Sequence, residues 1–275
     1  MQANKPKTLG RQTAKLIAAL HDQSKELFGH RDVAKITDLK PGSVRSLVAG
    51  LVNRGIATRI KRGLFILVPF ELGSEREYIG NPYVVARELA GGGQYYLSHA
   101  AAMEIHRMVT QPQLVVYTTT PRAIRPKVVL GTEFRFVQCK PEHYFGFAEE
   151  WLTKTEQIRV SDLERTVIDG LKQSEYCGGF TELAKGFWMR RDDMSSDRLV
   201  DYALRLNVGA VIRRLGFLLE LFDVGATTQV ERLQSRLTAT FQLLDPMMPA
   251  EGKKLSRWRL RLNVTPEEIE SIVRT

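Results

Sequence analysis

The sequence has few cysteines and no long hydrophobic run. Cys139 and Cys177 are its only cysteines, too few for a disulfide framework and not spaced as the Cys-x-x-Cys pair of a metal site. We therefore expect reduced thiols and no structural metal. No apolar stretch approaches the roughly 20 residues of a membrane-spanning helix, and the first residues lack the apolar segment of a secretory signal. These absences predict a cytoplasmic protein that has no membrane partner.

The motifs of the common enzyme classes are also missing. There is no nucleophile elbow, kinase signature or zinc motif. The glycine triplet at 91–93 is followed neither by Lys-Ser/Thr nor by a spaced G-x-G-x-x-G pattern, so it predicts the end of a helix rather than a phosphate-binding loop. We expect no enzymatic activity and no cofactor.

Negative charge is scarce in the first quarter of the chain. Residues 1–70 hold 13 Lys and Arg against four Asp and Glu, a net charge of +9, whereas residues 71–275 hold 27 against 27. A concentrated positive field attracts a polyanion and makes its binding depend on salt. The alternative is a basic surface that only keeps the protein soluble. The helix pattern that coincides with this charge favours nucleic acid as the partner.

A helix with a polar outer face is predicted within the basic region, from about residue 41 to residue 54. Pro41 suits the first turn of a helix, and Gly55 follows the last apolar position, where a positive φ ends a helix. The inward stripe has the i, i+3, i+4, i+7 spacing of an amphipathic helix: Val44, Leu47, Val48 and Leu51. The outward residues are short, polar and without a carboxylate.

The neighbouring segments complete a winged helix-turn-helix. Two β-prone runs at 56–60 and 64–68 flank a turn in which Gly63 can take the left-handed conformation. Shorter helices are expected at 11–22 and 30–36. We predict that the third helix enters the major groove of double-stranded DNA and that the basic hairpin follows the phosphates. The predicted DNA-binding residues are Lys40, Ser43, Arg45, Ser46, Asn53, Arg59, Lys61 and Arg62.

The rest of the chain predicts a larger mixed α/β (α+β) domain. We expect a winged-helix domain over 1–70, an acidic linker over 71–81 and an α/β domain over 82–275. Helices are expected at 82–90, 98–108, 162–172, 180–190, 196–206, 208–222, 228–241 and 266–273, and strands at 113–120, 127–130, 133–138, 157–160 and 256–264.

Polar residues beside apolar helix stripes give the second domain a candidate functional surface. Ser161 with Glu164 reads as a capping box, and Arg165 and Asp169 are spaced i, i+4. They form either a local ion pair or part of a functional surface. Arg213 and Arg214 lie in an apolar helix, where they pair with a carboxylate such as Glu220 or Asp223 or contact a partner. The candidate surface is His99, His106, Arg165, Asp169, Arg213 and Arg214; the histidine spacing favours packed histidines over metal ligands. Trp151 is expected in the core.

Several segments together resemble the AbiEi antitoxins of bacterial abortive-infection, type IV toxin-antitoxin systems. They are Arg-Gly-Leu-Phe ending at Phe65, Tyr-Leu-Ser-His-Ala-Ala-Ala from Tyr96 with His106, Val-Ser-Asp-Leu-Glu-Arg-Thr-Val-Ile-Asp from Val160, and Ile-Arg-Arg-Leu-Gly-Phe-Leu-Leu-Glu from Ile212. The resemblance implies an autorepressor that binds inverted repeats upstream of its own operon, with two copies on the DNA. It also implies a C-terminal domain that opposes a nucleotidyltransferase-like toxin, in many members without a stable complex, as part of phage defence.

Two other functions fit the same pattern of charge and helices. The first is a ligand-responsive winged-helix regulator unrelated to a toxin, whose second domain senses a small molecule. The second is a nuclease or phosphotransferase that a DNA-binding module directs to its substrate. The neighbouring reading frame distinguishes the leading hypothesis from the first alternative, because a toxin-like gene favours an antitoxin and a metabolic operon favours a sensor.

Overall fold

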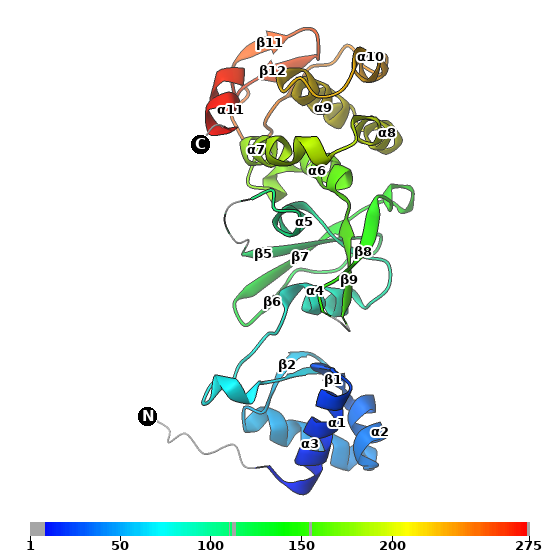
Figure 1. The fold of residues 1–275 in the computed structure, drawn as a ribbon, viewed down its shortest axis with the longest axis vertical. Helices are drawn as coiled ribbons and strands as arrows, with labels where there is room; N and C mark the ends of the chain where they lie inside the picture. Colours follow the sequence, from blue (N-terminus) through cyan, green and yellow to red (C-terminus); the bar gives the residue numbers. More distant parts are fainter. Residues whose placement is uncertain (1–8, 110, 112–113, 154–155, 274–275) are drawn as a thin grey trace.

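The computed structural model describes residues 9–109, 111, 114–153 and 156–273. Its secondary structure is a mixture of helices and three sheets, so the predicted α/β (α+β) class is confirmed. Figure 1 shows three parts along the longest axis: an N-terminal unit, a central sheet, which has six strands, and a helical C-terminal part. The first eight residues of the predicted winged-helix domain and residue 113 of a predicted strand lie outside the described residues.

The N-terminal unit combines three helices with a three-stranded sheet. Both glycines expected to have a positive φ do so, Gly55 at 66° and Gly63 at 80°. The sheet order is β1-β3-β2, antiparallel throughout. The short strand β1 was not predicted. The elements are α1 (Arg11–Asp22), β1 (Leu27–Gly29), α2 (His30–Thr37), α3 (Pro41–Asn53), β2 (Ala57–Lys61) and β3 (Leu64–Leu67), followed by the 3-10 turn η1 (Phe70–Leu72).

The three-stranded sheet of this unit is covered on both faces. Phe28, Phe65 and Leu67 pack with the three helices in one core. The neighbouring positions Leu27 and Ile66 point the other way, because successive side chains of a strand alternate between faces. They join the core of the central sheet. The N-terminal unit therefore packs directly against the rest of the chain.

A six-stranded mixed sheet forms the centre, in the order β6-β7-β5-β4-β9-β8. β5 runs parallel to β7 and β4 runs parallel to β9, while the other pairs are antiparallel. The predicted strand pattern missed β4 and β8. The elements are α4 (Pro82–Ala90), β4 (Tyr96–Leu97), α5 (His99–Ile105), β5 (Val115–Thr120), β6 (Lys127–Val129), β7 (Thr132–Gln138), η2 (Pro141–His143), β8 (Phe147–Trp151) and β9 (Gln157–Ser161).

The C-terminal part is helical with a small sheet, ordered β10-β12-β11. Its core surrounds the fully buried Trp258 and Phe180. The elements are α6 (Leu163–Lys172), η3 (Ser174–Tyr176), α7 (Phe180–Arg190), η4 (Arg191–Asp193), α8 (Ser196–Leu206), α9 (Gly209–Leu221), α10 (Thr227–Gln234), β10 (Gln242–Leu243), β11 (Lys253–Leu255), β12 (Leu260–Leu262) and α11 (Pro266–Val273). Across the described ranges, none of the helices has the length and apolar character to cross a membrane.

Four local predictions are corrected. The N-cap of α6 is Asp162 rather than Ser161, because the Asp162 carboxylate accepts the Arg165 backbone N–H at 2.7 Å. Glu164 accepts the backbone N–H of Ser195 instead of closing a capping box. Helix α10 ends at Gln234, well before the predicted residue 241. Trp151 is 64% exposed on the edge strand β8 and is not a core residue.

Candidate nucleic-acid interface and neighbouring sites

The outer face of α3 is exposed and has no carboxylate. Its buried stripe is Val44, Val48 and Leu51, as the periodicity predicts. The five predicted groove residues are all exposed, and among the described residues none of their side chains is hydrogen-bonded or ion-paired: Lys40, Ser43, Arg45, Ser46 and Asn53. Because nothing inside this part of the chain uses these polar groups, they are available to an external partner.

Two of the three predicted hairpin cations share this exposure. Arg59 lies opposite Phe65 in the β2–β3 ladder, where its side chain is exposed. Arg62 is exposed in the turn between the strands. Neither is ion-paired within the described ranges. The hairpin therefore exposes two guanidinium groups on the surface of the N-terminal unit.

Lys61 differs from its neighbours. The β2–β3 pairing register shifts between Arg59 and Lys61. The Lys61 ammonium donates a hydrogen bond to the backbone carbonyl of Glu88 in α4. Burial lowers the pKa of Lys61, and the charge of Lys127 lowers it further, although the Glu88 carboxylate opposes both. The lysine thus faces the central sheet unit, and we correct its predicted role as a phosphate contact.

Helix α2 carries a basic pair that the sequence reasoning did not include. Arg31 and Lys35 are both exposed and, at i and i+4, lie on the same side of the helix. The spacing of four residues between Arg31 and Lys35 could have predicted a basic face of this helix from the sequence. They add two exposed cations to the N-terminal unit.

Two of the six residues predicted as a surface in the second domain, Arg165 and Asp169, form a buried network with Tyr96 instead. Arg165 and Asp169 make an ion pair at 2.9 Å, with their side chains only 2% and 5% exposed. The Tyr96 hydroxyl donates to Asp169 Oδ2 at 3.1 Å and accepts from Arg165 Nη2 at 3.0 Å. Although burial lowers the pKa of Arg165, the charges of Asp169 and Tyr96 raise it on balance. The local ion pair is therefore confirmed.

The two histidines are also held inside the chain. His99 is buried at a positive φ of 51°, and its Nδ1 lies 2.9 Å from the Ser98 hydroxyl oxygen. Burial lowers the pKa of His99 to about 4. His106 donates from Nε2 to the Ser161 carbonyl at 2.6 Å. Among the described residues, no group of His, Cys, Asp and Glu is arranged to hold a metal ion.

Arg213 and Arg214 are buried too, and their partners are backbone carbonyls and the Thr238 hydroxyl rather than the expected carboxylates. Arg213 donates to the carbonyls of Thr238 and Thr240, each at 3.1 Å. Arg214 donates to the Leu171 carbonyl at 2.6 Å and to the Leu243 carbonyl at 3.1 Å. These arginines fix α9 to the segment that leads into β10. All six residues of the predicted surface therefore have polar partners inside the chain, and that prediction is corrected.

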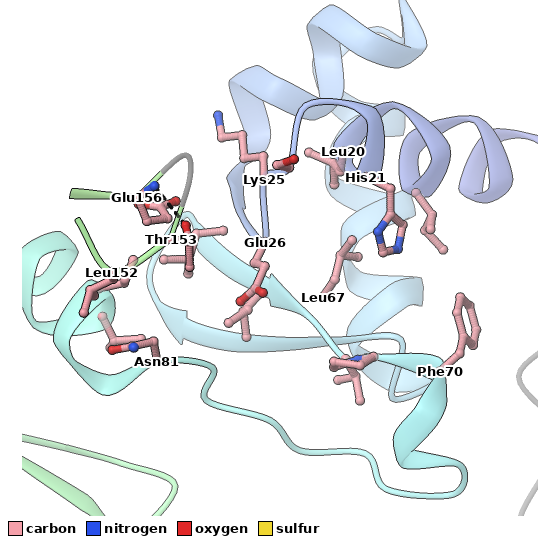
Figure 2. A pocket seen from close by; sticks show the side chains of 18 of the residues that line it. Leu20, His21, Lys25, Glu26, Leu67, Phe70, Asn81, Leu152, Thr153 and Glu156 are labelled. Atoms are coloured by element: carbon pink, nitrogen blue, oxygen red, sulfur yellow. Dashed lines mark hydrogen bonds between the residues drawn. The ribbon is translucent and has the colours of Figure 1, made fainter. Parts of the chain in front are cut away.

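A cavity of about 460 Å³ lies between the N-terminal unit and the central sheet. Figure 2 shows Leu20 and Leu67 on one side of it and Asn81 and Leu152 on the other. Ten of its 19 lining residues are aliphatic and seven are polar or charged, among them the exposed Glu26. This volume is in the range of small-molecule sites.

Comparison with known proteins gives a likeness of fold. No family model matches the chain, and no curated protein matches its sequence. The crystal structure of the Rv2827c protein from Mycobacterium tuberculosis is similar, with a TM-score of 0.72 over 99% of this chain and 97% of that one, at 13% sequence identity. At this identity the likeness shows that the whole chain shares an architecture with that protein.

Proposed function

We propose that this chain is an antitoxin that represses its own operon, and that its N-terminal unit binds inverted repeats in double-stranded DNA. The observation that carries the DNA-binding part is the exposed, carboxylate-free face of α3 together with two exposed hairpin arginines that have no ion pair among the described residues. The net charge of +9 in residues 1–70 supports it, because the remaining 205 residues are neutral overall.

The two sets of residues have different roles in this proposal. Arg45 and Ser46 contact base edges in the major groove, where arginine recognises guanine by two hydrogen bonds. Arg59 and Arg62 contact phosphates and fix the position of the protein on the duplex. A single unit of this size reads few base pairs, so two copies on an inverted repeat supply the specificity.

Binding to the DNA upstream of its own gene tests these roles. We expect Arg59→Ala with Arg62→Ala to weaken binding to specific and unrelated duplexes alike. Arg45→Ala should instead reduce the preference for the operator, by about 1–3 kcal/mol for one lost bidentate contact. The exposed Arg232→Ala, far along the chain in α10, is the matched control for loss of positive charge. An equal loss of operator affinity in all of these variants, the Arg232→Ala control included, would contradict the proposal.

We infer that the part after residue 82 opposes the nucleotidyltransferase-like toxin. The six polar residues first considered for this role are internal, so the two edges of the six-stranded sheet become the better candidates. Val128 on edge strand β6 is 69% exposed, and Trp151 on edge strand β8 is 64% exposed. Exposed apolar residues of this kind are typical of protein contact sites when they gather in patches.

Toxin neutralisation is tested by rescue of cells in which the toxin is made from a foreign promoter. The full chain is used, because Leu27, Ile60 and Ile66 of the N-terminal unit belong to the core of the central sheet. The variant with Arg59→Ala and Arg62→Ala should still rescue, since repression plays no part under a foreign promoter. Loss of rescue by this folded variant would contradict a separate antitoxin activity.

The cavity between the two units favours a second candidate function, a ligand-responsive regulator. A small apolar molecule bound there would contact α1 and the hairpin as well as α4, and would thereby couple the second domain to the DNA-binding unit. Filling the cavity with Leu152→Trp should then alter operator affinity although Leu152 lies outside the DNA-binding unit. Unchanged affinity in this variant, together with a toxin-like neighbouring gene, would favour the antitoxin.

A further inference from the structure

An open cleft of about 570 Å³ lies in the second domain, between the end of β7 and the junction of α8 with α9. It is separate from the α3 face and from the cavity beside α4. Its chemistry is given by six of its lining residues: Cys139, Lys140, His143, Lys172, Arg205 and Asn207.

The cleft concentrates positive charge in a domain that is otherwise balanced. Lys140, Lys172 and Arg205 line it, and Glu142 is the one acid in its described wall. Glu142 lies 3.9 Å from Lys140, and both side chains are mostly exposed, so this pair is weak. Within the described ranges neither Lys172 nor Arg205 has a carboxylate partner.

The surroundings add to this charge. The Arg205 guanidinium lies 3.9 Å from the centre of the Phe145 ring, and the buried Arg165 lies 4.3 Å from the same ring. Arg165 Nε and Nη1 are buried without a hydrogen-bond partner among the described residues. Burial lowers the pKa of His143, and Lys172, Arg165 and Lys140 lower it further, against Glu142 alone. The electrostatic potential around Phe145 and His143 is therefore positive.

The cleft also reaches the N-terminus of the 13-residue helix α9. Asn207 and Val208 line it, and Val208 is the N-cap residue. This cap has no side-chain hydrogen bond, and the first turn has no acidic residue. The first N–H groups of a helix lack intrahelical acceptors and carry partial positive charge, which favours an anion.

We propose that this cleft binds the phosphate group of a small phosphorylated molecule, with Lys172 and Arg205 on the phosphate oxygens and the start of α9 beside them. Arginine and lysine are the usual partners of phosphate. A bound polynucleotide would need a longer basic track, whereas residues 71–275 have as many acids as bases. The site is independent of the proposed repression and neutralisation, because it uses neither the α3 face nor the sheet edges.

Calorimetric titration of the full chain with pyrophosphate and with ATP, at constant ionic strength, tests the proposal. We expect saturable binding with one molecule per chain for at least one of these probes. Lys172→Gln with Arg205→Gln should weaken it at least tenfold, and each single variant should weaken it less. Arg59→Ala with Arg62→Ala should leave it unchanged, which separates the cleft from the basic N-terminal unit.

Two results would overturn the assignment. The first is no saturable binding of either probe by the wild-type chain. The second is wild-type affinity in the Lys172→Gln, Arg205→Gln variant. Melting temperatures of all variants are measured alongside. If the double variant is unfolded, Arg205→Gln alone decides, because Arg205 is exposed and its loss leaves no buried charge.

Discussion

Removal of Arg165 should destabilise the fold strongly. Breaking a buried ion pair by deleting one partner costs roughly 3–5 kcal/mol, because the other charge stays buried without compensation. Here Asp169 would keep the Tyr96 hydroxyl as a donor at 3.1 Å, so we expect the lower part of this range for Arg165→Ala. For a chain of 150–250 residues, about 2–4 °C in Tm corresponds to 1 kcal/mol. The expected loss is therefore about 6–12 °C, from roughly 3 kcal/mol.

Thermal unfolding followed by circular dichroism measures this loss. The matched control is Arg232→Ala, which removes an arginine from an ion pair with Asp201 whose side chains are 45% and 60% exposed. An exposed pair contributes about 1 kcal/mol or less, so this variant should stay within a few degrees of the wild type. The structural role of Arg165 would be refuted if the Tm of Arg165→Ala equalled that of Arg232→Ala while rescue from the toxin was lost. Arg165 would then be a functional residue.

Three further outcomes are expected from the buried parts of the chain. Gly216→Ala should lower Tm, because the added Cβ would lie 2.1 Å from Trp258, whereas Gly42→Ala, with nothing within 4 Å, should not. Burial lowers the pKa of His99 to about 4 from 6.5, so between these pH values the unfolded chain binds more protons than the folded chain, and stability falls as the pH drops. The Tm of His99→Gln should therefore depend less on pH between 4 and 6.5 than the Tm of the wild type. The same dependence of Tm on pH in both proteins would contradict this. Lys61→Ala should leave DNA affinity unchanged, because Lys61 donates to Glu88; a loss as large as that of Arg59→Ala would restore its predicted role.

Local sequence patterns predicted most elements of the N-terminal unit. Helix α1 has the predicted bounds, 11–22, and α3 ends one residue before the expected end. The amphipathic stripe, Pro41 and the two glycines are signals within a few residues of each other, so they could be read without the fold. Strand β1 has three residues, too few to show an alternating pattern, and only its pairing with β3 makes it a strand.

The environment of the polar residues could not be read in the same way. Arg213 was expected to meet a carboxylate nearby, but its acceptors are the carbonyls of Thr238 and Thr240, which are brought to it by the chain after α10. Lys61 resembled its neighbours in the sequence, but the packing of the hairpin against α4 gives it an acceptor inside the protein. In both cases an acceptor distant in sequence is supplied by the tertiary structure, although Arg213 also donates to the Gly209 carbonyl within α9.

The dependence of DNA affinity on salt tests the central proposal most directly. Each phosphate contact contributes a slope of about 0.9 in a plot of log affinity against log salt concentration. For the full chain on duplex DNA from upstream of its gene, measured by fluorescence anisotropy, Arg59→Ala with Arg62→Ala should therefore reduce the slope by about 1.8 per bound copy. Lys61→Ala is the control and should keep the wild-type slope. A wild-type slope in the double variant, or no binding by the wild-type chain, would contradict the proposed DNA-binding surface.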